Sequence, residues 1–246
     1  MRLAWQKPCC MRRLDNVLLK APITGMDKVI CVALNYKDHC EEHKLPPPPV
    51  PMVFSKFAST IIGPSEPLLI RTDVTCKVDW EVELCIVMGK KASCVNKCRA
   101  YEYIFGCTIA NDVTARDWQK EKNGGQFLLG KSMDTFCPLG PWIVTLDEFA
   151  NIDNLDVKFS LNGVTKQNSN TSQLIHKIPA IIERITQVMT LLPGDLILTG
   201  SPSGVGIYAD PPEFMKPGDI LRGEIENIGV LVTRVERYIK PVDYPQ

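Results

Sequence analysis

The chain has 246 residues, of which 28 are basic and 28 acidic, so its formal net charge is zero. This balance gives no support to a nucleic-acid-binding surface, and no apolar run reaches the roughly 20 residues of a membrane-spanning helix. The partners we expect are therefore small molecules and a second copy of the chain.

Ten cysteines are scattered along the chain without a pair of C-x-x-C motifs. This spacing predicts free thiols in a reducing compartment rather than disulfides or a zinc site. The first 13 residues are basic and contain no acid, as at the start of a mitochondrial presequence.

The first expected elements are a strand, a turn and a loop. Residues 27–34 form an apolar run typical of a buried strand, and residues 35–43 form a short polar helical turn. Four prolines at 46–49 exclude a helix or central strand, so a surface loop of the kind that makes lids is expected there. Residues 53–57 resume extended structure.

The stretch 78–87 alternates acidic and apolar residues with a period of two. As one β-strand it places Asp79, Glu81 and Glu83 on one face and apolar side chains on the other. Carboxylates collected in this way repel one another unless a cation lies between them. The alternative is an edge strand whose acidic face lies in water.

The rest of the chain alternates strands with a few short helices. A helix is expected over 94–103, a strand over 104–110 that ends at Asn111-Asp112, and a helical turn over 114–121. Asn162-Gly163 predicts a hairpin. Further expected elements are an amphipathic helix over 179–192, strands over 196–199, 220–225 and 229–233, and a glycine-rich loop over 200–206. This pattern predicts a β-rich α+β fold or a rolled sheet, as one unit without an internal linker.

Glu81, Glu83 and Asp112 are carboxylates at or just after strand segments. Oxygen ligands of this kind suit Mg²⁺, with Mn²⁺ or Ca²⁺ as substitutes, and three protein ligands leave positions for water or substrate. Spacing alone is equally consistent with Asp112 as a helix N-cap.

His39 and Glu42 lie three residues apart on the first helical turn and are a candidate acid/base pair, unless the histidine faces solvent. The segment 39–43 also satisfies H-x-x-E-H, a zinc pattern of peptidases that requires a long helix and a third ligand. Lys131, between Gly130 and Ser132, is a candidate cation for a bound anion.

Six motifs taken together resemble the fumarylacetoacetate hydrolase superfamily, and look most like its type-2 domain-containing proteins. They occur in order between residues 27 and 235. They are Asn35-Tyr36-x-x-His39-x-x-Glu42, Phe54-Ser55-Lys56-Phe57, Asp79-Trp80-Glu81-Val82-Glu83-Leu84, Asn111 to Gln119, Leu129 to Pro141, and Leu198 to Gly206.

The resemblance implies a rolled mixed β-sheet, usually in a homodimer, and a mitochondrial location with cytoplasm as the alternative. It implies Mg²⁺ on Glu81, Glu83 and Asp112. It also implies a His39–Glu42 dyad on a lid, with the substrate surrounded by Lys131, Arg116, Gln119 and Thr199. The expected organisation is a catalytic domain at 27–240, an N-terminal extension at 1–26 that is shortened relative to the type-2 proteins, and a tail at 241–246.

The activity that the resemblance favours is oxaloacetate keto–enol tautomerisation through a metal-stabilised enolate of a small 2-oxo acid. Hydrolysis of acylpyruvates or β-diketo acids and oxaloacetate decarboxylation share this enolate and remain alternatives. True fumarylacetoacetases carry a further carboxylate before the histidine, where this chain has apolar residues at 32–34. A catalytically silent dimeric scaffold is the alternative from another class, and it predicts a damaged site.

Overall fold

The computed structural model describes residues 13–240, so the basic N-terminal start and the tail at 241–246 lie outside the described residues. Within the described part, no helix is both long and apolar enough to cross a membrane. Its eight cysteines are all unpaired, as expected, and those of the strand segments are buried.

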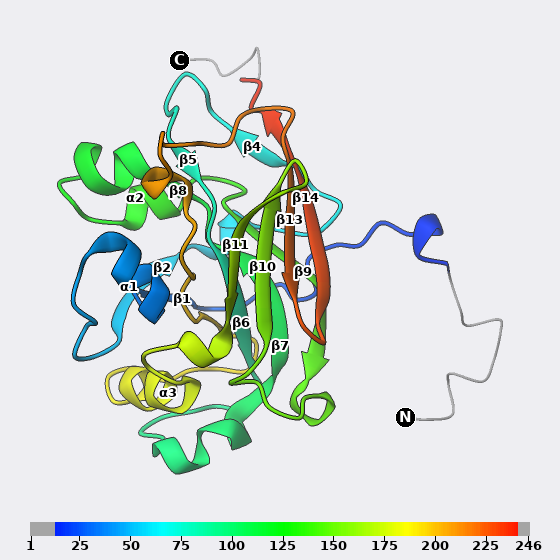
Figure 1. Cartoon of the computed structure of the whole chain (residues 1–246). Coiled ribbons are helices and arrows are strands. Elements are labelled where there is room, and N and C mark those ends of the chain that lie inside the picture. The colour runs from blue at the N-terminus through cyan, green and yellow to red at the C-terminus, as the bar shows by residue number, and fades with distance from the viewer. Residues whose placement is uncertain (1–12, 241–246) are drawn as a thin grey trace, which may run out of the picture.

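The larger sheet forms the centre of the molecule (Figure 1). It is mixed, because β1 pairs with β12 in parallel whereas β6 pairs with both of its neighbours in the antiparallel sense. Its order across the sheet is β2 (Met52–Lys56), β1 (Val29–Ala33), β12 (Leu196–Leu198), β6 (Val82–Met88), β7 (Ile104–Asn111), β9 (Cys137–Thr145) and β3 (Ile61–Ile62).

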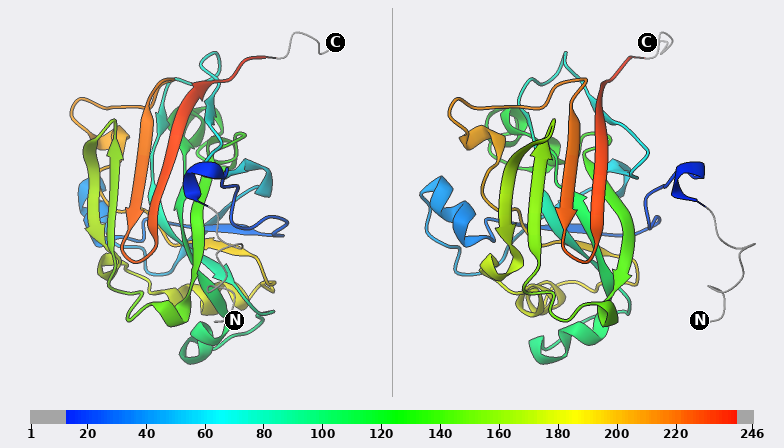
Figure 2. Two further views of the ribbon diagram at one scale, coloured as in Figure 1. Left: turned by 90° about the vertical axis from the view of Figure 1, so that its right-hand side faces the viewer. Right: turned by 45° about the vertical axis from the view of Figure 1, so that its right-hand side comes forward.

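A second sheet packs against the first as a separate layer (Figure 2). Its order is β11 (Val164–Asn170), β10 (Asp156–Leu161), β13 (Ile220–Ile225), β14 (Gly229–Arg237) and β4 (Leu68–Ile70). The layers share an apolar core that includes Val82, Ile109, Phe159, Leu221 and Leu231. The β-rich α+β, rolled-sheet expectation is therefore confirmed.

Helices are short and lie around the sheets. The α-helices are α1 (Lys37–His43), α2 (Leu128–Lys131) and α3 (Ile178–Thr186). The π-helix is η6 (Trp118–Lys122). The 3-10 turns are η3 (Leu14–Asn16), η4 (Ala58–Thr60), η5 (Lys97–Tyr103), η7 (Leu146–Glu148), η8 (Thr171–Gln173) and η9 (Gly206–Tyr208).

The acidic strand is interrupted where a continuous one was expected. Its first part, β5 (Val78–Asp79), pairs only with β8 (Thr114–Ala115), and β6 starts at Val82. Between them, the Trp80 amide donates to the Asp79 carboxylate (2.8 Å) and the Glu81 amide donates to the Asn111 side chain (2.9 Å). Side chains thus replace the strand ladder at this point, and both faces of the stretch are buried rather than exposed to water.

Three further expectations require correction. The helical turn expected over 114–121 starts as strand β8, and its helical part is η6. The long helix ends at Thr186, because Leu191 is held by backbone hydrogen bonds to Ala92 instead. Strand β9 was not foreseen, since its Cys-Pro-Leu-Gly-Pro sequence lacks strand alternation. The hairpin is confirmed, with positive φ at Asn162 and Gly163 as a type I′ turn requires.

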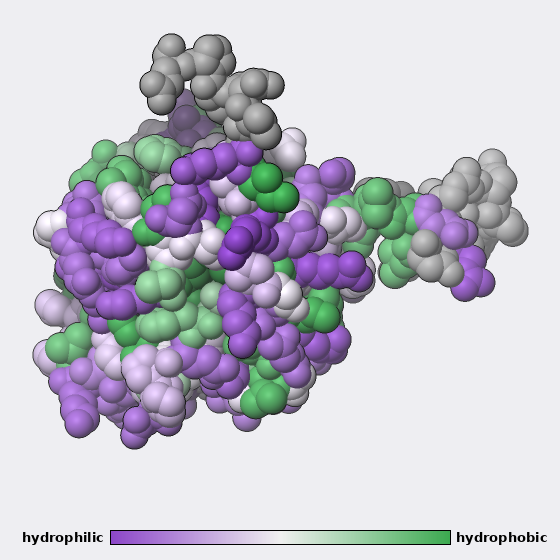
Figure 3. All heavy atoms as spheres, turned by 90° about the horizontal axis from the view of Figure 1, so that it is seen from above, coloured by the Kyte–Doolittle hydropathy of each residue, from purple (hydrophilic) through white to green (hydrophobic). Residues whose placement is uncertain are grey.

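Residues 13–18 form an arm that stands away from the body in Figures 1 and 3. Leu14 and Leu18 on this arm are 64% and 80% exposed. The chain reaches the body at Leu19, whose carbonyl accepts a hydrogen bond from the Ser65 amide. Exposed leucines on a projecting arm are apolar surface that the single chain does not cover.

Candidate functional site

The structure brings Glu81, Glu83 and Asp112 together. Glu81 directly precedes β6 and Glu83 is its second residue, and Asp112 directly follows β7, the neighbouring strand in the sheet. All three side chains are buried, and each offers a carboxylate oxygen within 4.8 Å of the others. The Asp112 carboxylate accepts hydrogen bonds from lysines rather than from a helix N-terminus, so the N-cap alternative is wrong.

Two buried lysines neutralise part of this charge. The Lys131 ammonium lies 2.6 Å from both the Glu81 Oε2 and the Asp112 Oδ2 atoms. The Lys56 ammonium lies 2.8 Å from Asp112 Oδ1 and also donates to the backbone carbonyls of Val113 and Lys131. Lys56 therefore fixes both a candidate metal ligand and the turn that carries Lys131.

Arg116 links the acidic stretch to the next segment. Its Nε atom lies 2.8 Å from Asp79 Oδ2 and its Nη1 atom 2.7 Å from Glu81 Oε1. Nη1 also donates to the Gln119 side-chain oxygen at 3.1 Å. Asp79 is therefore the ion-pair partner of Arg116, and it does not join the three carboxylates that could hold a metal ion.

The two glutamates experience opposite electrostatic environments. Burial acts to raise the pKa of Glu81, but the Lys131 and Arg116 charges beside it outweigh burial and hold that pKa below its usual value. Burial raises the pKa of Glu83 well above its usual value, and the negative charges of Asp112 and Glu81 add to the effect. Among the described residues, no cation forms an ion pair with Glu83.

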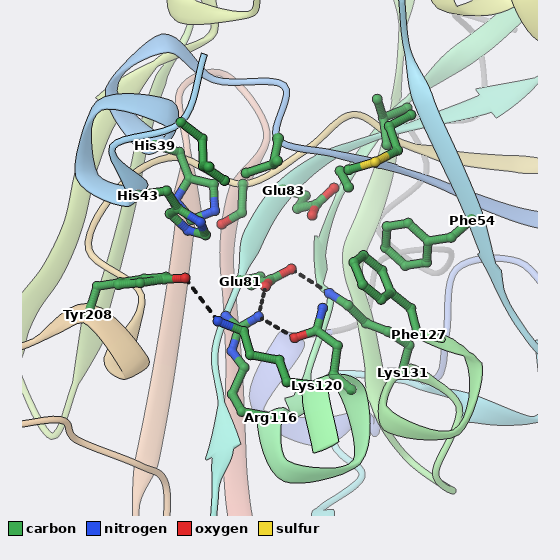
Figure 4. Close-up of a pocket in the computed structure, with 17 residues that line it drawn as sticks. His39, His43, Phe54, Glu81, Glu83, Arg116, Lys120, Phe127, Lys131 and Tyr208 are labelled. Atoms are coloured by element: carbon green, nitrogen blue, oxygen red, sulfur yellow. Dashed lines mark hydrogen bonds and ion pairs between the residues drawn. The ribbon is translucent and has the colours of Figure 1, made fainter. Parts of the chain in front are cut away.

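His39 and Glu42 form the expected pair on α1. The His39 Nδ1 atom lies 3.0 Å from Glu42 Oε2, and the other oxygen of Glu42 accepts a hydrogen bond from the Gly204 amide at 2.8 Å. His39 is only 6% exposed, so the solvent-facing alternative is wrong. His39 lines the cavity from the segment that precedes the proline-rich loop (Figure 4).

The zinc-peptidase alternative for residues 39–43 does not fit this geometry. Helix α1 has only seven residues and ends where Lys44 adopts a left-handed conformation. The remaining histidine, His176, directs its Nε2 atom to the carbonyl of Pro48 at 2.9 Å. Glu42 lies close to both histidines but is held by His39 and the Gly204 amide. Within residues 13–240 no histidine of a later helix supplies the third ligand, and the long helix that the pattern needs is lacking.

The glycine-rich loop 200–206 holds carboxylates of the protein itself. Its backbone amides donate to one oxygen on each of three acidic side chains, which fixes these side chains around the cavity. The bonds run from Gly200 to Glu83 (2.7 Å), from Gly204 to Glu42 (2.8 Å), and from Gly206 to Asp79 (2.7 Å).

The backbone of this loop requires glycine at two of these positions. Gly200 and Gly204 have φ angles of +108° and +96°, a region that side chains rarely adopt. A Cβ atom at Gly204 would lie 2.0 Å from the carbonyl oxygen of Lys166. The glycine-rich sequence predicted a loop whose amides could hold a carboxylate, and the carboxylates it holds belong to the protein itself.

Several of these residues line one cavity of about 210 Å³ (Figure 4). Asp112 and Glu42 do not line it but pair with the lining residues Lys131 and His39. Phe54 and Phe127 form its apolar wall, with ring centroids 5.6 Å apart. Of the expected site residues, the lining includes His39, Glu81, Glu83, Arg116, Gln119 and Lys131. Thr199 lies behind it, because its buried hydroxyl donates to the Leu84 carbonyl at 2.9 Å.

Sequence reasoning missed four other residues at this site. Lys56 supports Asp112, and His43, Lys120 and Tyr208 line the cavity. A signal existed for Lys56: alternation in the extended segment 53–57 places it on the same face as Phe54, and a lysine on an apolar face needs a buried partner. The other three come from separate turns, and nothing in their local sequence brings them together.

The donor set fits a divalent cation. Four buried carboxylates (Asp79, Glu81, Glu83 and Asp112) face three cations (Arg116, Lys131 and Lys56), which leaves an excess of one negative charge. The carboxylate without an ion pair is Glu83, one of the three convergent oxygen donors. Oxygen-only donors in a cavity with room for further ligands suit Mg²⁺ or Mn²⁺.

Comparison with known proteins agrees with this fold. The sequence pattern described as fumarylacetoacetate (FAA) hydrolase C-terminal matches residues 28–236. The oxaloacetate tautomerase FAHD2A, mitochondrial, of Bos taurus is 47% identical over 95% of this chain and 73% of that protein. The human protein of the same name is 46% identical over the same shares.

Solved structures share the fold. A fumarylacetoacetate hydrolase from Exiguobacterium antarcticum has a TM-score of 0.85 and 39% identity, and the match covers 93% of this chain and 81% of that one. A maleylpyruvate hydrolase from Sphingobium, solved with manganese(II) and pyruvate, has a TM-score of 0.78 and 30% identity over 92% of this chain and 76% of that one. Fold and site thus define an enzyme that acts on small molecules. The chain belongs to the fumarylacetoacetate hydrolase family.

Proposed function

We propose that this enzyme is a divalent-metal-dependent oxaloacetate keto–enol tautomerase. The observation that carries the proposal is that Glu81, Glu83, Lys131 and His39 line one small cavity, with Asp112 and Glu42 paired to Lys131 and His39 directly behind it. The relatives named oxaloacetate tautomerase support the choice of reaction. The intact site argues against a silent scaffold.

Glu81, Glu83 and Asp112 would hold the cation, which we propose to be Mg²⁺ with Mn²⁺ or Ca²⁺ as substitutes. When bound, such a cation supplies Lewis acidity that favours the enolate of a 2-oxo acid. This set of three oxygen donors leaves room for the oxygens of a substrate.

The proton is moved by the protein's own residues. With the Nδ1 proton of His39 donated to Glu42, the Nε2 atom remains as the base that takes a proton from C3 of the keto form, and protonation of the C2 oxygen completes the enol. In the reverse direction the enol O–H loses its proton and His39 returns one to C3. Glu42 is itself fixed by the Gly204 amide, so the imidazole is oriented before substrate binds. Lys131 offsets negative charge that develops on the substrate oxygen, and Arg116 and Gln119 position the substrate.

The test is an assay of enol-oxaloacetate with purified protein, following the loss of enol absorbance. We expect Mg²⁺-dependent acceleration over buffer that falls at least about 100-fold in His39→Ala, because general acid–base catalysis contributes on that scale. The Val188→Ala variant, on an exposed turn, is the matched control and should keep its rate. A rate equal to that of buffer would reject the proposal.

Carbon–carbon hydrolysis is the second candidate, and oxaloacetate decarboxylation the third. The His39–Glu42 pair is equally placed to activate a water molecule, and the maleylpyruvate hydrolase shares the fold. A panel of 2-oxo acids scored separately for enol loss, pyruvate and CO₂ distinguishes the three. Pyruvate release from an acylpyruvate faster than enol loss from oxaloacetate would favour the hydrolase.

We also propose a homodimer in mitochondria. The exposed leucines of the arm at 13–18 support a second copy as the partner, and the names of the relatives support the compartment. Microscopy of a fluorescent fusion of the full chain tests the location, and a diffuse cytoplasmic signal would contradict it.

A further inference from the structure

The outer part of the cavity carries a group of side chains that the proposed reaction does not use. His43 ends α1, Lys120 lies in η6 and Tyr208 ends η9, so three segments far apart in the sequence meet there (Figure 4). Lys120 and Tyr208 are exposed, whereas Glu81 and Glu83 are buried. The group therefore lies on the solvent side of the carboxylates.

These side chains form one connected unit. The Lys120 ammonium donates to the Tyr208 hydroxyl at 2.9 Å. The ring centroids of His43 and Tyr208 are 4.0 Å apart, and those of His43 and His39 are 4.1 Å apart. The unit thus extends from the proposed base to the mouth of the cavity.

Hydrogen-bonding capacity is left unused in this unit. Two buried nitrogens of cavity-lining residues, His43 Nε2 and Arg116 Nη2, have no hydrogen-bond partner in the described structure. No carboxylate within residues 13–240 forms an ion pair with Lys120. Burial lowers the pKa of His43 to about 3, with further contributions from the His39, Arg116 and Lys120 charges, so this imidazole is neutral at pH 7. A buried polar nitrogen without a partner is costly unless a ligand satisfies it.

The chemistry of the missing partner follows from these groups. An unpaired ammonium, a guanidinium nitrogen and a neutral imidazole at one end of a cavity match the acceptor oxygens of a carboxylate. Glu81 and Glu83 line the buried part of the same cavity, where the 2-oxo acid end of the substrate would bind. A cavity of about 210 Å³ accommodates a small acid that reaches from these carboxylates to the exposed group.

We propose that His43, Lys120 and Tyr208, with the free Arg116 Nη2 atom, form a subsite for a second carboxylate of the substrate. The inference rests on the proposed function in that it places the 2-oxo acid end at the triad. It assigns the enzyme to dicarboxylic rather than monocarboxylic 2-oxo acids, and it makes Lys120 and Tyr208 specificity-determining residues.

Binding of two non-reacting ligands tests the subsite without reference to catalysis. Malate and 2-hydroxybutyrate share the 2-hydroxy acid end, but only malate has a distal carboxylate. In calorimetry at saturating Mg²⁺, we expect the unaltered protein to bind malate more tightly than 2-hydroxybutyrate. In Lys120→Met the ratio of the two affinities should fall about fivefold. Affinity for 2-hydroxybutyrate should stay the same.

The matched control is Lys122→Met, two residues further along η6. The Lys122 ammonium pairs with Asp117 at 2.8 Å, and Lys122 does not line the cavity. Both substitutions remove one positive charge, so the net charge of the two variants is the same. Tyr208→Phe removes only the hydroxyl and should reduce the preference in the same direction. Equal affinities of the unaltered protein for the two ligands, or an unchanged preference in Lys120→Met, would overturn the subsite.

Kinetics separates this inference from the proposed function. With enol-oxaloacetate and its C4 methyl ester, Lys120→Met should raise KM for the diacid about fivefold with little change in kcat, and leave the ester unaffected. If the unaltered protein selects malate through Lys120 but does not tautomerise oxaloacetate, the subsite stands and the proposed reaction fails. If diacid and ester are turned over with equal kcat/KM, the subsite fails and the reaction stands.

Discussion

At the scale of single residues, Glu81 and Glu83 show how two carboxylates two positions apart acquire different roles. Glu81 is balanced by Lys131 and Arg116, whereas Glu83 has only the Gly200 amide as a hydrogen-bond donor in the part of the chain that the structure describes. A buried carboxylate without a counter-ion destabilises the metal-free fold, and a cation at the triad relieves that cost. The difference is the physical argument for a metal at this position.

Glutamine has nearly the same shape as glutamate but no charge. Replacing Glu81 or Glu83 by glutamine should therefore change the free energy of unfolding in opposite directions. In chelator, we expect Glu83→Gln to raise the free energy of unfolding by on the order of 1 kcal/mol, because a raised pKa marks a charge that the fold disfavours. Glu81→Gln should lower it by about 3 kcal/mol, since Lys131 and Arg116 each lose one of their two buried carboxylate partners. Urea unfolding measures both, and changes of the same sign would contradict this electrostatic account.

Much of the site was predictable at this scale, and the reason is chemical. Period-two acids in an apolar stretch and an Asn-Asp pair at a strand end are local signals, so the triad could be proposed from the sequence. Lys56 and Asp79 gain their roles from partners tens of residues away, on other strands. Local sequence carries little information about such partners.

At the scale of elements, the loop at 200–206 organises the site. It follows β12, the strand between β1 and β6, so it emerges beside both α1 and the acidic stretch. Its amides then reach carboxylates from two separate segments of the chain.

Hairpins and buried strands were predictable because their signals are local. The interruption at Trp80–Glu81 was not, because the Trp80 indole donates to Gly204 and the Glu81 amide to Asn111, both far along the chain.

Substitution at Gly204 should test this role of the loop. Gly204→Ala combines an unfavourable φ with a collision against the Lys166 carbonyl, and it moves the amide that holds Glu42. We expect a loss of about 2–3 kcal/mol in stability and a large fall in kcat.

Gly218→Ala is the matched control, with a φ of +99° and open space around the new methyl group. It should cost about 1 kcal/mol and leave kcat unchanged. Equal effects of the two substitutions on kcat would show that the loop does not position the catalytic pair.

At the scale of the whole molecule, the lining residues place the cavity at one end of the central strands β1, β12 and β6. The arm with its exposed leucines stands outside the body (Figure 1). The rolled mixed sheet was an expectation that the family resemblance implied. Spacing alone does not specify the order of the strands, because this order depends on long-range pairings. Leu14 and Leu18 on the arm are the kind of exposed apolar surface that a second copy would cover.

Sedimentation velocity of the purified chain tests the dimer. We expect twice the mass of one chain, and a shift toward the monomer in the double variant Leu14→Asp, Leu18→Asp, because burial of charged side chains opposes association. Val188→Asp, at a similarly exposed position on another element, is the control and should remain dimeric. A monomer for the unaltered chain would contradict the proposal.

All of the proposed chemistry depends on a cation held by three carboxylates, and calorimetric titration of chelator-treated protein with Mg²⁺ and Mn²⁺ tests this directly. We expect one site per chain in the unaltered protein and no measurable binding in Asp112→Asn, which keeps the shape of the side chain but removes its charge. Absence of binding to the unaltered protein, or equal affinity in Asp112→Asn, would contradict the account.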